Sequence, residues 1–322
     1  MSEAGGAIRK PLAEQRPDRA GDNPDLDPFR LADGTLIGLL DLGPSDADAT
    51  VVLVHGWTQD HTSWDDVVER LQTTCPELRV IAYDARGHGW SDAGPRGSST
   101  IDQFADDLAE IITILVPHGS VVLAGHSLGG PVIMSFAERH PALVRKRVRG
   151  VALVATSAAG LGKDIFGLSG RLTAPVMLAA PLVTKVRSWS RAPMNLRRPG
   201  AIAAALRLGL YGPGAATRHN RNRTAAQVGR SHPATTAQLV NEMVGHDRLH
   251  TLGELDRTPT VVLAGTKDAL CPMAHSRAMA QAMPNAELVV YPQAGHMLPY
   301  ERAEQVSDQL VRLAGMTAGR PS

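Results

Sequence analysis

The stretch Val121-Val122-Leu123-Ala124-Gly125-His126-Ser127-Leu128-Gly129-Gly130 decides the fold that this sequence predicts. An apolar, partly β-branched run ends in Gly-His-Ser-Leu-Gly, and an amphipathic helical pattern follows over residues 130–139. This is the G-x-S-x-G pattern between a strand and a helix, which exposes a serine hydroxyl on a strained turn. Side chains two residues before and after the serine would collide with neighbouring backbone, and Gly125 and Gly129 remove those collisions. The pattern predicts Ser127 as a nucleophile at a helix N-terminus, where free N–H groups favour negative charge.

Strand and helix patterns alternate on both sides of this stretch. Further strands are expected at residues 50–55, 79–83, 150–156, 259–264 and 288–291, and further helices at residues 63–72, 100–116, 273–283 and 301–313. A turn signal, Ala32-Asp33-Gly34-Thr35, lies between two short strands within residues 29–42. This alternation predicts an α/β fold with a mostly parallel, doubly wound sheet.

The alternation is interrupted once, over residues 157–250. Gly, Pro, Ala and Arg dominate this segment, which shows helical fragments and no clear strand. We therefore expect a helical cap inserted after the sixth strand, between two parts of the core at residues 29–156 and 251–322. Residues 1–28 are rich in Pro, Gly, Asp and Arg, and we expect them to form a disordered N-terminal arm.

Composition limits where such a protein is expected to work. The chain of 322 residues is 43% hydrophobic, enough for one large core, and its net charge is only +1. Cys75 and Cys271 are its two cysteines, so a disulfide framework is not expected and a reducing compartment is the simpler interpretation. No apolar signal segment is visible near the N-terminus, and no apolar run is long enough to span a bilayer. We expect a soluble, cytoplasmic protein.

A serine hydroxyl becomes a nucleophile when a base, oriented by a carboxylate, takes its proton. Asp268 follows the predicted strand at residues 259–264, and His296 follows the last predicted strand. Because the carboxyl ends of parallel strands meet at one edge of the sheet, these two residues are expected beside Ser127. Asp84 and Asp247 remain as alternative acids, although Asp84 is better placed to hydrogen-bond its own turn.

These motifs resemble the α/β-hydrolase fold superfamily, and specifically its serine esterase/lipase-like branch, over residues 29–313. The resemblance implies an order of serine, acid and histidine along the chain, as in Ser127, Asp268 and His296. It also implies an oxyanion hole formed by the backbone N–H groups of Leu128 and Trp57. By the same resemblance His55 and His88 are expected to be structural, and His126 stands at the variable position of the elbow.

The resemblance implies a hydrolase of carboxylic esters with small to medium acyl chains, acting through an acyl-enzyme without metal or cofactor. Thioesterase, C–C bond hydrolase and cofactor-free perhydrolase activity remain alternatives, because related enzymes share the triad. A serine in place of the aspartate of related dehalogenases and epoxide hydrolases argues against those two activities. A ligand receptor built on the same fold is the alternative outside enzymes.

The predicted cap is strongly basic, because residues 160–250 contain 13 Lys and Arg residues against three acidic ones. These arginines either offset an acidic core or attract an anionic acyl substrate or the head groups of an anionic membrane. Nucleic acid is not expected as a partner, since aromatic residues are 4% of the chain and no binding motif is present. His246 and His250 have the i, i+4 spacing of helical zinc ligands but lack the usual glutamate and a third ligand.

Overall fold

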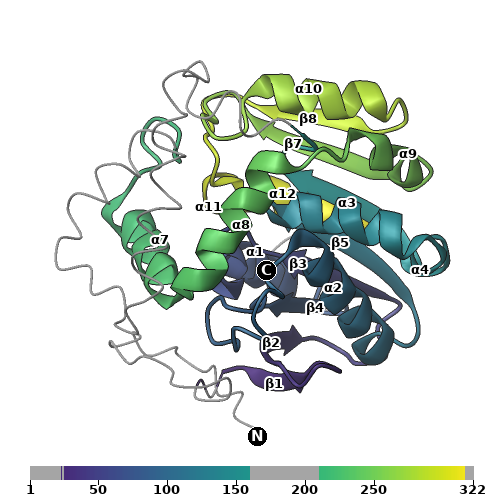
Figure 1. Cartoon of the computed structure of the whole chain (residues 1–322). Helices are drawn as coiled ribbons and strands as arrows, with labels where there is room; N and C mark the ends of the chain where they lie inside the picture. The colour runs from purple at the N-terminus through teal and green to yellow at the C-terminus, as the bar shows by residue number, and fades with distance from the viewer. Residues whose placement is uncertain (1–22, 24, 160–209, 316–322) are drawn as a thin grey trace, which may run out of the picture.

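The computed structural model describes residues 23, 25–159 and 210–315. In this part of the chain eight strands form one sheet in the order β1-β2-β4-β3-β5-β6-β7-β8 (Figure 1). They are β1 (Asp27–Arg30), β2 (Leu36–Leu42), β3 (Ala49–Val54), β4 (Arg79–Tyr83), β5 (Ser120–His126), β6 (Val148–Val154), β7 (Thr260–Gly265) and β8 (Glu287–Tyr291). β2 pairs antiparallel with β1 and β4, and all other neighbours are parallel, which confirms the predicted fold class.

Helices cover both faces of the sheet (Figure 1). They are α1 (Asp65–Thr74), α2 (Ile101–Leu115), α3 (Gly129–Arg139), α4 (Pro141–Arg147), α7 (Arg218–Arg230), α8 (Pro233–Gly245), α9 (Leu252–Leu255), α10 (Met273–Ala282), α11 (Leu298–Glu301) and α12 (Ala303–Leu313), with 3₁₀ turns η1 (His61–Trp64) and η3 (Leu249–Thr251). Apolar side chains of α2, α3 and α10 pack on one face, and those of α1 and α12 pack on the other.

The strands form where they do because continuous apolar runs can be buried on both faces of a sheet. In β3, Val52 and Val54 belong to the core on the α2 and α3 side, whereas Val51 and Leu53 belong to the opposite core. This follows from the alternation of side chains along a strand. Helix α2 begins where predicted, since the hydroxyl of its N-cap Thr100 accepts a hydrogen bond from the N–H of Gln103.

The expected hairpin joins β1 and β2. Gly34 has φ +89°, and the Asp33 carboxylate accepts a hydrogen bond from the N–H of Thr35, so the turn residues act as the sequence predicts. β1 begins at Asp27, two residues before the predicted start of the core. The short helices α4, α9 and α11 were not predicted, because segments of four to seven residues carry little periodicity.

Helices α7 and α8 lie between β6 and β7 in the chain, within the segment predicted as a cap. The first turn of α8 is held against the loop after β4, where the His232 N–H donates to the Gly87 carbonyl oxygen at 2.8 Å. A methyl group on Gly87 would overlap Thr235 of α8, so this close approach needs a glycine. Among the described residues, no helix is both long and apolar enough to cross a membrane.

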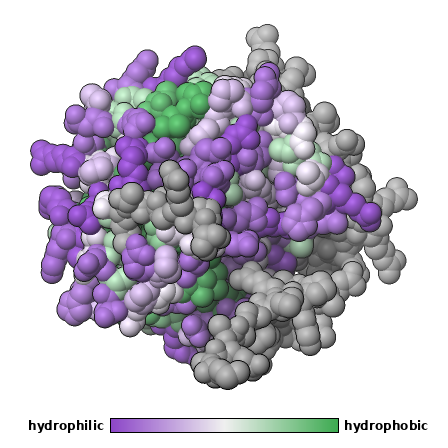
Figure 2. Space-filling model, turned by 180° about the vertical axis from the view of Figure 1, so that it is seen from behind, coloured by the Kyte–Doolittle hydropathy of each residue, from purple (hydrophilic) through white to green (hydrophobic). Residues whose placement is uncertain are grey.

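The edge of the sheet at β8 is partly apolar on its outside. Leu288 and Val289 are half-buried and Val290 is 39% exposed, because β8 has a neighbouring strand on only one side in the described sheet. Figure 2 shows an otherwise largely hydrophilic rear surface with two apolar areas, one of them on the side where β8 and α10 lie in Figure 1.

Candidate active site

The predicted nucleophile lies on a strained turn between β5 and α3. Ser127 has φ +53° and is partly exposed, and its carbonyl oxygen accepts hydrogen bonds from the Gly130 N–H and the Thr156 hydroxyl. A Cβ atom on Gly125 would lie 2.4 Å from the Gly129 carbonyl oxygen, and one on Gly129 would lie 2.4 Å from the Val54 carbonyl oxygen. The expectation that both glycines avoid backbone collisions is confirmed.

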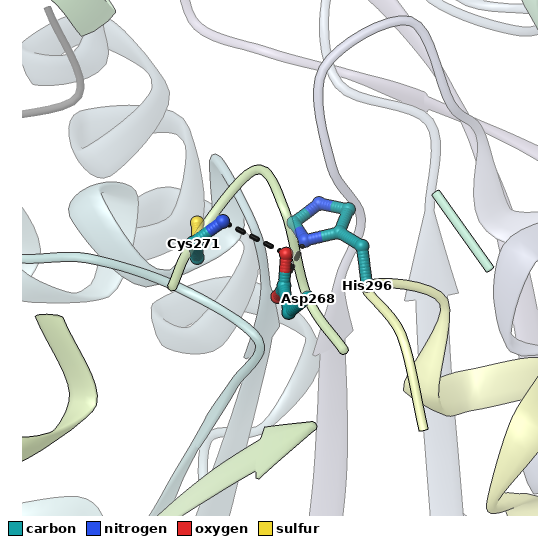
Figure 3. A group of neighbouring side chains, drawn as sticks. All are labelled: Asp268, Cys271 and His296. Carbon is teal, nitrogen blue, oxygen red and sulfur yellow. Dashed lines mark hydrogen bonds and ion pairs between the residues drawn. The ribbon is translucent and has the colours of Figure 1, made fainter. Parts of the chain in front are cut away.

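Asp268 and His296 lie together at the same edge of the sheet, after β7 and β8 (Figure 3). His296 Nδ1 is 2.9 Å from Asp268 Oδ2, and both side chains are almost fully buried. The other carboxylate oxygen, Oδ1, accepts hydrogen bonds from the backbone N–H groups of Leu270 at 2.9 Å and Cys271 at 2.8 Å. These two donors fix the carboxylate, which in turn fixes the imidazole with a proton on Nδ1.

The connection between Ser127 and His296 runs through His126. His126 Nε2 lies 2.9 Å from the His296 carbonyl oxygen, and the two rings are 4.9 Å apart between centroids. Within the described residues the Ser127 hydroxyl makes no hydrogen bond, so no direct bond joins it to His296. The backbone N–H of His296 donates to the Leu210 carbonyl oxygen at 2.8 Å, which gives its loop a second attachment.

The predicted oxyanion loop passes beside the serine. A Cβ atom on Gly56 would lie 3.1 Å from Ser127 Cβ, so the chain approaches the nucleophile closely here. The backbone N–H groups of Trp57 and Leu128 donate no hydrogen bond to any described residue. The indole N–H of Trp57 donates to the Thr236 carbonyl oxygen of α8 at 3.1 Å, and 37% of this residue is exposed.

The other motif histidines have structural surroundings. His55 Nε2 accepts a hydrogen bond from the Ala85 N–H, and its Nδ1 donates to the Gly56 carbonyl oxygen. Burial lowers the pKa of His88 to about 3, with a smaller contribution from His55. Burial and the neighbouring His296 likewise lower the pKa of His126 to about 3. Its two nitrogens face acceptors, Gln59 Oε1 and the His296 carbonyl oxygen, and a neutral ring donates to only one of them.

The alternative acids are placed differently. Asp84 accepts hydrogen bonds from the backbone N–H groups of His61 and Trp90 and faces His61 Nδ1 at 2.8 Å, so it organises its own turn. Asp247 is exposed. His246 is buried after the end of α8, whereas His250 lies in η3 with an exposed side chain. The helical spacing suggested by these two histidines is therefore wrong, because α8 ends at Gly245.

Two groups of side chains in the described part of the chain bring three metal-ligating atoms together: Asp268, Cys271 and His296, and Asp60, His61 and Asp84. In Figure 3 Asp268 lies between Cys271 and His296. No motif of the sequence connects this cysteine to the site, although it stands three residues after Asp268.

The described arginines of the predicted cap are partly engaged by the core. Arg230 of α7 pairs with the fully buried Asp60 at 2.6 Å and lies 4.5 Å above the Trp90 ring. Arg223 pairs with Asp66 at 2.8 Å and lies over the Tyr300 ring. These two arginines hold α7 on an acidic part of the core, whereas Arg187, Arg191, Arg197 and Arg198 lie outside the described residues.

Comparison with known proteins assigns the chain to a fold family. Residues 49–303 match the family described as "alpha/beta hydrolase fold". A dihydrolipoyllysine-residue acetyltransferase component of an acetoin cleaving system from Pseudomonas putida is 32% identical over 86% of this chain and 66% of its own length. A bifunctional esterase/perhydrolase from Acinetobacter calcoaceticus is 36% identical over 34% of this chain and 38% of its own length.

Among solved structures, a thermophilic esterase from Thermogutta terrifontis superposes with a TM-score of 0.68 at 28% identity. That comparison covers 89% of this chain and 97% of the esterase. The chain belongs to the α/β-hydrolase fold family, in which its structural relatives include esterases.

Proposed function

We propose that this protein is a serine hydrolase that cleaves carboxylic esters of small to medium acyl chains. The observation that carries the proposal is the buried Asp268–His296 hydrogen bond, at the sheet edge where Ser127 stands on its strained turn. Esterases among the structural relatives support the same class of reaction. In this proposal Ser127 is the nucleophile, His296 the general base and Asp268 the residue that orients it.

The proposed reaction follows from the tautomer of His296. Because Nδ1 carries the proton that faces Asp268, Nε2 is free to take the proton of the serine hydroxyl as Ser127 attacks the ester carbonyl. The backbone N–H groups of Trp57 and Leu128 stabilise the resulting oxyanion, and losing one such donor costs roughly 3–4 kcal/mol. His296 then returns the proton to the leaving alcohol, and water hydrolyses the acyl-enzyme.

A second candidate function differs only in what accepts the acyl group. The relatives named as an acetyltransferase component and as an esterase/perhydrolase favour acceptors other than water. A thiol or hydrogen peroxide attacking the same acyl-enzyme would give a thioester or a peracid. Adding each acceptor during ester turnover and measuring these products against the free acid separates the candidates.

The predicted cap is proposed to select the substrate. Residues 172–186 of this segment are apolar with prolines, a composition that predicts one wall of a hydrophobic pocket, and they lie outside the described residues. Attraction of anionic substrates or membranes would rest on the arginines that are not paired with the core. A steep fall of kcat/KM for anionic esters with increasing salt would support this attraction, and a flat response would remove it.

The cytoplasmic location also remains a prediction.

The proposed function is tested by hydrolysis of p-nitrophenyl esters from acetate to palmitate, with Ser127→Ala as the comparison. We expect turnover with an optimum at one chain length that disappears in Ser127→Ala. A fluorophosphonate probe should label the wild type and not this variant. Equal turnover by both proteins would overturn the role of Ser127. Folded protein with neither turnover nor labelling would favour the receptor alternative.

A further inference from the structure

The candidate general base, His296, belongs to a group of three side chains with different donor atoms. His296 Nδ1 and Asp268 Oδ2 are 2.9 Å apart, and the Cys271 sulfur lies with them in a group whose ligand atoms are all within 4.8 Å of one another (Figure 3). All three residues are at most 6% exposed. A single ion can contact all three members after a small rearrangement, because ligand atoms around tetrahedral zinc are about 3.3–3.7 Å apart. His296 Nδ1 and Asp268 Oδ2 would move slightly apart, and the more distant atoms of the group would move closer.

The donor set suits one kind of ion. Thiolate, imidazole and carboxylate together favour Zn²⁺ and similar thiophilic cations over Mg²⁺ or Ca²⁺, which prefer oxygen ligands alone. The Asp268 carboxylate is already oriented, because its Oδ1 accepts two backbone N–H groups and its Oδ2 faces His296 Nδ1. Such outer hydrogen bonds strengthen a ligand and fix its direction.

Charge balance also favours an ion here. A divalent cation with one carboxylate and one thiolate is neutral overall, which is the least costly state for a buried site. Binding forms a metal–sulfur bond and releases the thiol proton to water.

We propose that Asp268, Cys271 and His296 form an inhibitory site for Zn²⁺ or a similar thiophilic divalent cation. The ion binds His296 Nδ1 in place of its proton, which widens the separation between Nδ1 and Asp268, and the proton displaced from Nδ1 moves to Nε2. An imidazole with its proton on Nε2 cannot accept the proton of Ser127. Inhibition rests on the proposed function of these residues, whereas binding of the ion does not.

The second group of possible ligands gives a useful contrast. Asp60 is paired with Arg230 at 2.6 Å, and Asp84 accepts two backbone N–H groups in addition to facing His61. A cation there would have to displace an arginine and leave it buried against the new positive charge. The group of Asp60, His61 and Asp84 is therefore an internal ion-pair network, and it provides no competing site.

Binding is tested by adding Co²⁺ to the whole protein and recording the thiolate-to-cobalt absorption in the near ultraviolet. Wild type and Ser127→Ala should both develop this band with one ion per chain, since the serine is not a ligand. Cys271→Ala should lose it, and the matched variant Cys75→Ala, altered at the other buried cysteine, should keep it. No band in the wild type, or an equal band in Cys271→Ala, would overturn the site whether or not the protein has esterase activity.

Inhibition is tested separately, by ester turnover after preincubation with Zn²⁺ or with Mg²⁺. We expect Zn²⁺ alone to inhibit, with Cys271→Ala retaining turnover and needing at least about tenfold more Zn²⁺, because one ligand is lost. Equal sensitivity of Cys271→Ala and the wild type would show that Zn²⁺ inhibits elsewhere and overturn the proposal.

Discussion

Two buried aspartate–histidine pairs follow the carboxyl ends of parallel strands in this protein. Asp268 and His296 are 2.9 Å apart, and Asp84 and His61 are 2.8 Å apart. All four side chains are at most 6% exposed, so neither distance nor burial separates the two pairs. Their surroundings do separate them, and the difference shows what makes such a pair a candidate for catalysis.

The Asp84–His61 pair is enclosed by backbone N–H groups and by neighbouring side chains. The two oxygens of Asp84 accept backbone N–H groups, and the His61 ring lies 5.4 Å from Trp90, which is covered by Arg230. The His296 ring instead lies against His126, the residue before the partly exposed Ser127. A carboxylate can orient either imidazole, but of the two histidines only His296 lies against the turn that carries Ser127, the partly exposed candidate nucleophile.

The largest expected effect is on kcat, when Asp268 and Asp84 are replaced in two separate variants and compared. In Asp268→Asn the amide no longer holds His296 in the required tautomer, and kcat should fall by about 10⁴-fold. The free energy of unfolding should change much less in Asp268→Asn than in Asp84→Asn. Ester turnover and urea unfolding of the purified variant measure both quantities.

Asp84→Asn is the matched variant on the other side of the comparison. It leaves buried N–H groups of the turn without a full set of acceptors, so we expect the free energy of unfolding to fall by about 2–4 kcal/mol. Turnover per folded molecule should stay within a few-fold of the wild type. A loss of kcat as large as in Asp268→Asn would mean that the Asp84 pair takes part in the reaction.

Arg230→Gln tests whether the surroundings of the Asp84–His61 pair depend on the ion pair that α7 of the predicted cap makes with Asp60. It leaves the buried Asp60 carboxylate without its cation, and breaking a largely buried pair is expected to cost roughly 3 kcal/mol. The exposed Arg218, also on α7, is the control, since Arg218→Gln should change stability by less than about 0.5 kcal/mol. Thermal or urea unfolding distinguishes the two, and equal stability of both variants would contradict the anchoring role of Arg230.

How much the sequence could predict depends on how local each feature is. Ser127, Asp268 and His296 each follow a recognisable strand, and the order of a parallel sheet brings their positions to one edge without any knowledge of side-chain contacts. Gly125 was predictable because its collision is with Gly129, four residues along the chain. Gly129 would collide with Val54, which the order of the parallel sheet brings beside the turn from the neighbouring strand.

Long-range pairs were not predictable in this way. The hydrogen bond between Arg230 and Asp60 joins residues 170 positions apart, and nothing in either local pattern selects the partner. Charge counting indicated a basic segment and an acidic remainder, but the individual ion pairs depend on how α7 lies on the core. The same holds for Cys271, whose sulfur becomes relevant only once His296 is placed beside Asp268.

His126→Phe tests whether the contact between His126 and the loop that carries His296 positions His296. It keeps a ring next to the nucleophile but removes the nitrogen that faces the His296 carbonyl oxygen, so the loop carrying His296 loses one attachment. Because a small misplacement of a reacting group is costly, kcat should fall about tenfold to a hundredfold with KM little changed. His250→Phe, at a 67% exposed side chain, should leave kcat unaltered. An increase in KM alone would indicate a role in substrate binding instead of positioning.

The smallest expected effect is the pH dependence of stability that His61 contributes. Burial lowers the pKa of His61, but the charge of Asp84 and its hydrogen bond raise it more, and the net pKa lies above the ordinary 6.5. A group whose pKa is raised on folding stabilises the folded protein fully below its unfolded pKa, and this contribution is lost as pH rises through the folded pKa. The difference in unfolding free energy between wild type and His61→Asn should therefore be largest in mild acid and decrease as pH rises above 6.5. Urea unfolding across this range measures it, and the pH profile of kcat/KM should be the same in both proteins. A difference that grows with pH, or a shifted activity profile, would show that the two aspartate–histidine pairs are not as separate as their surroundings indicate.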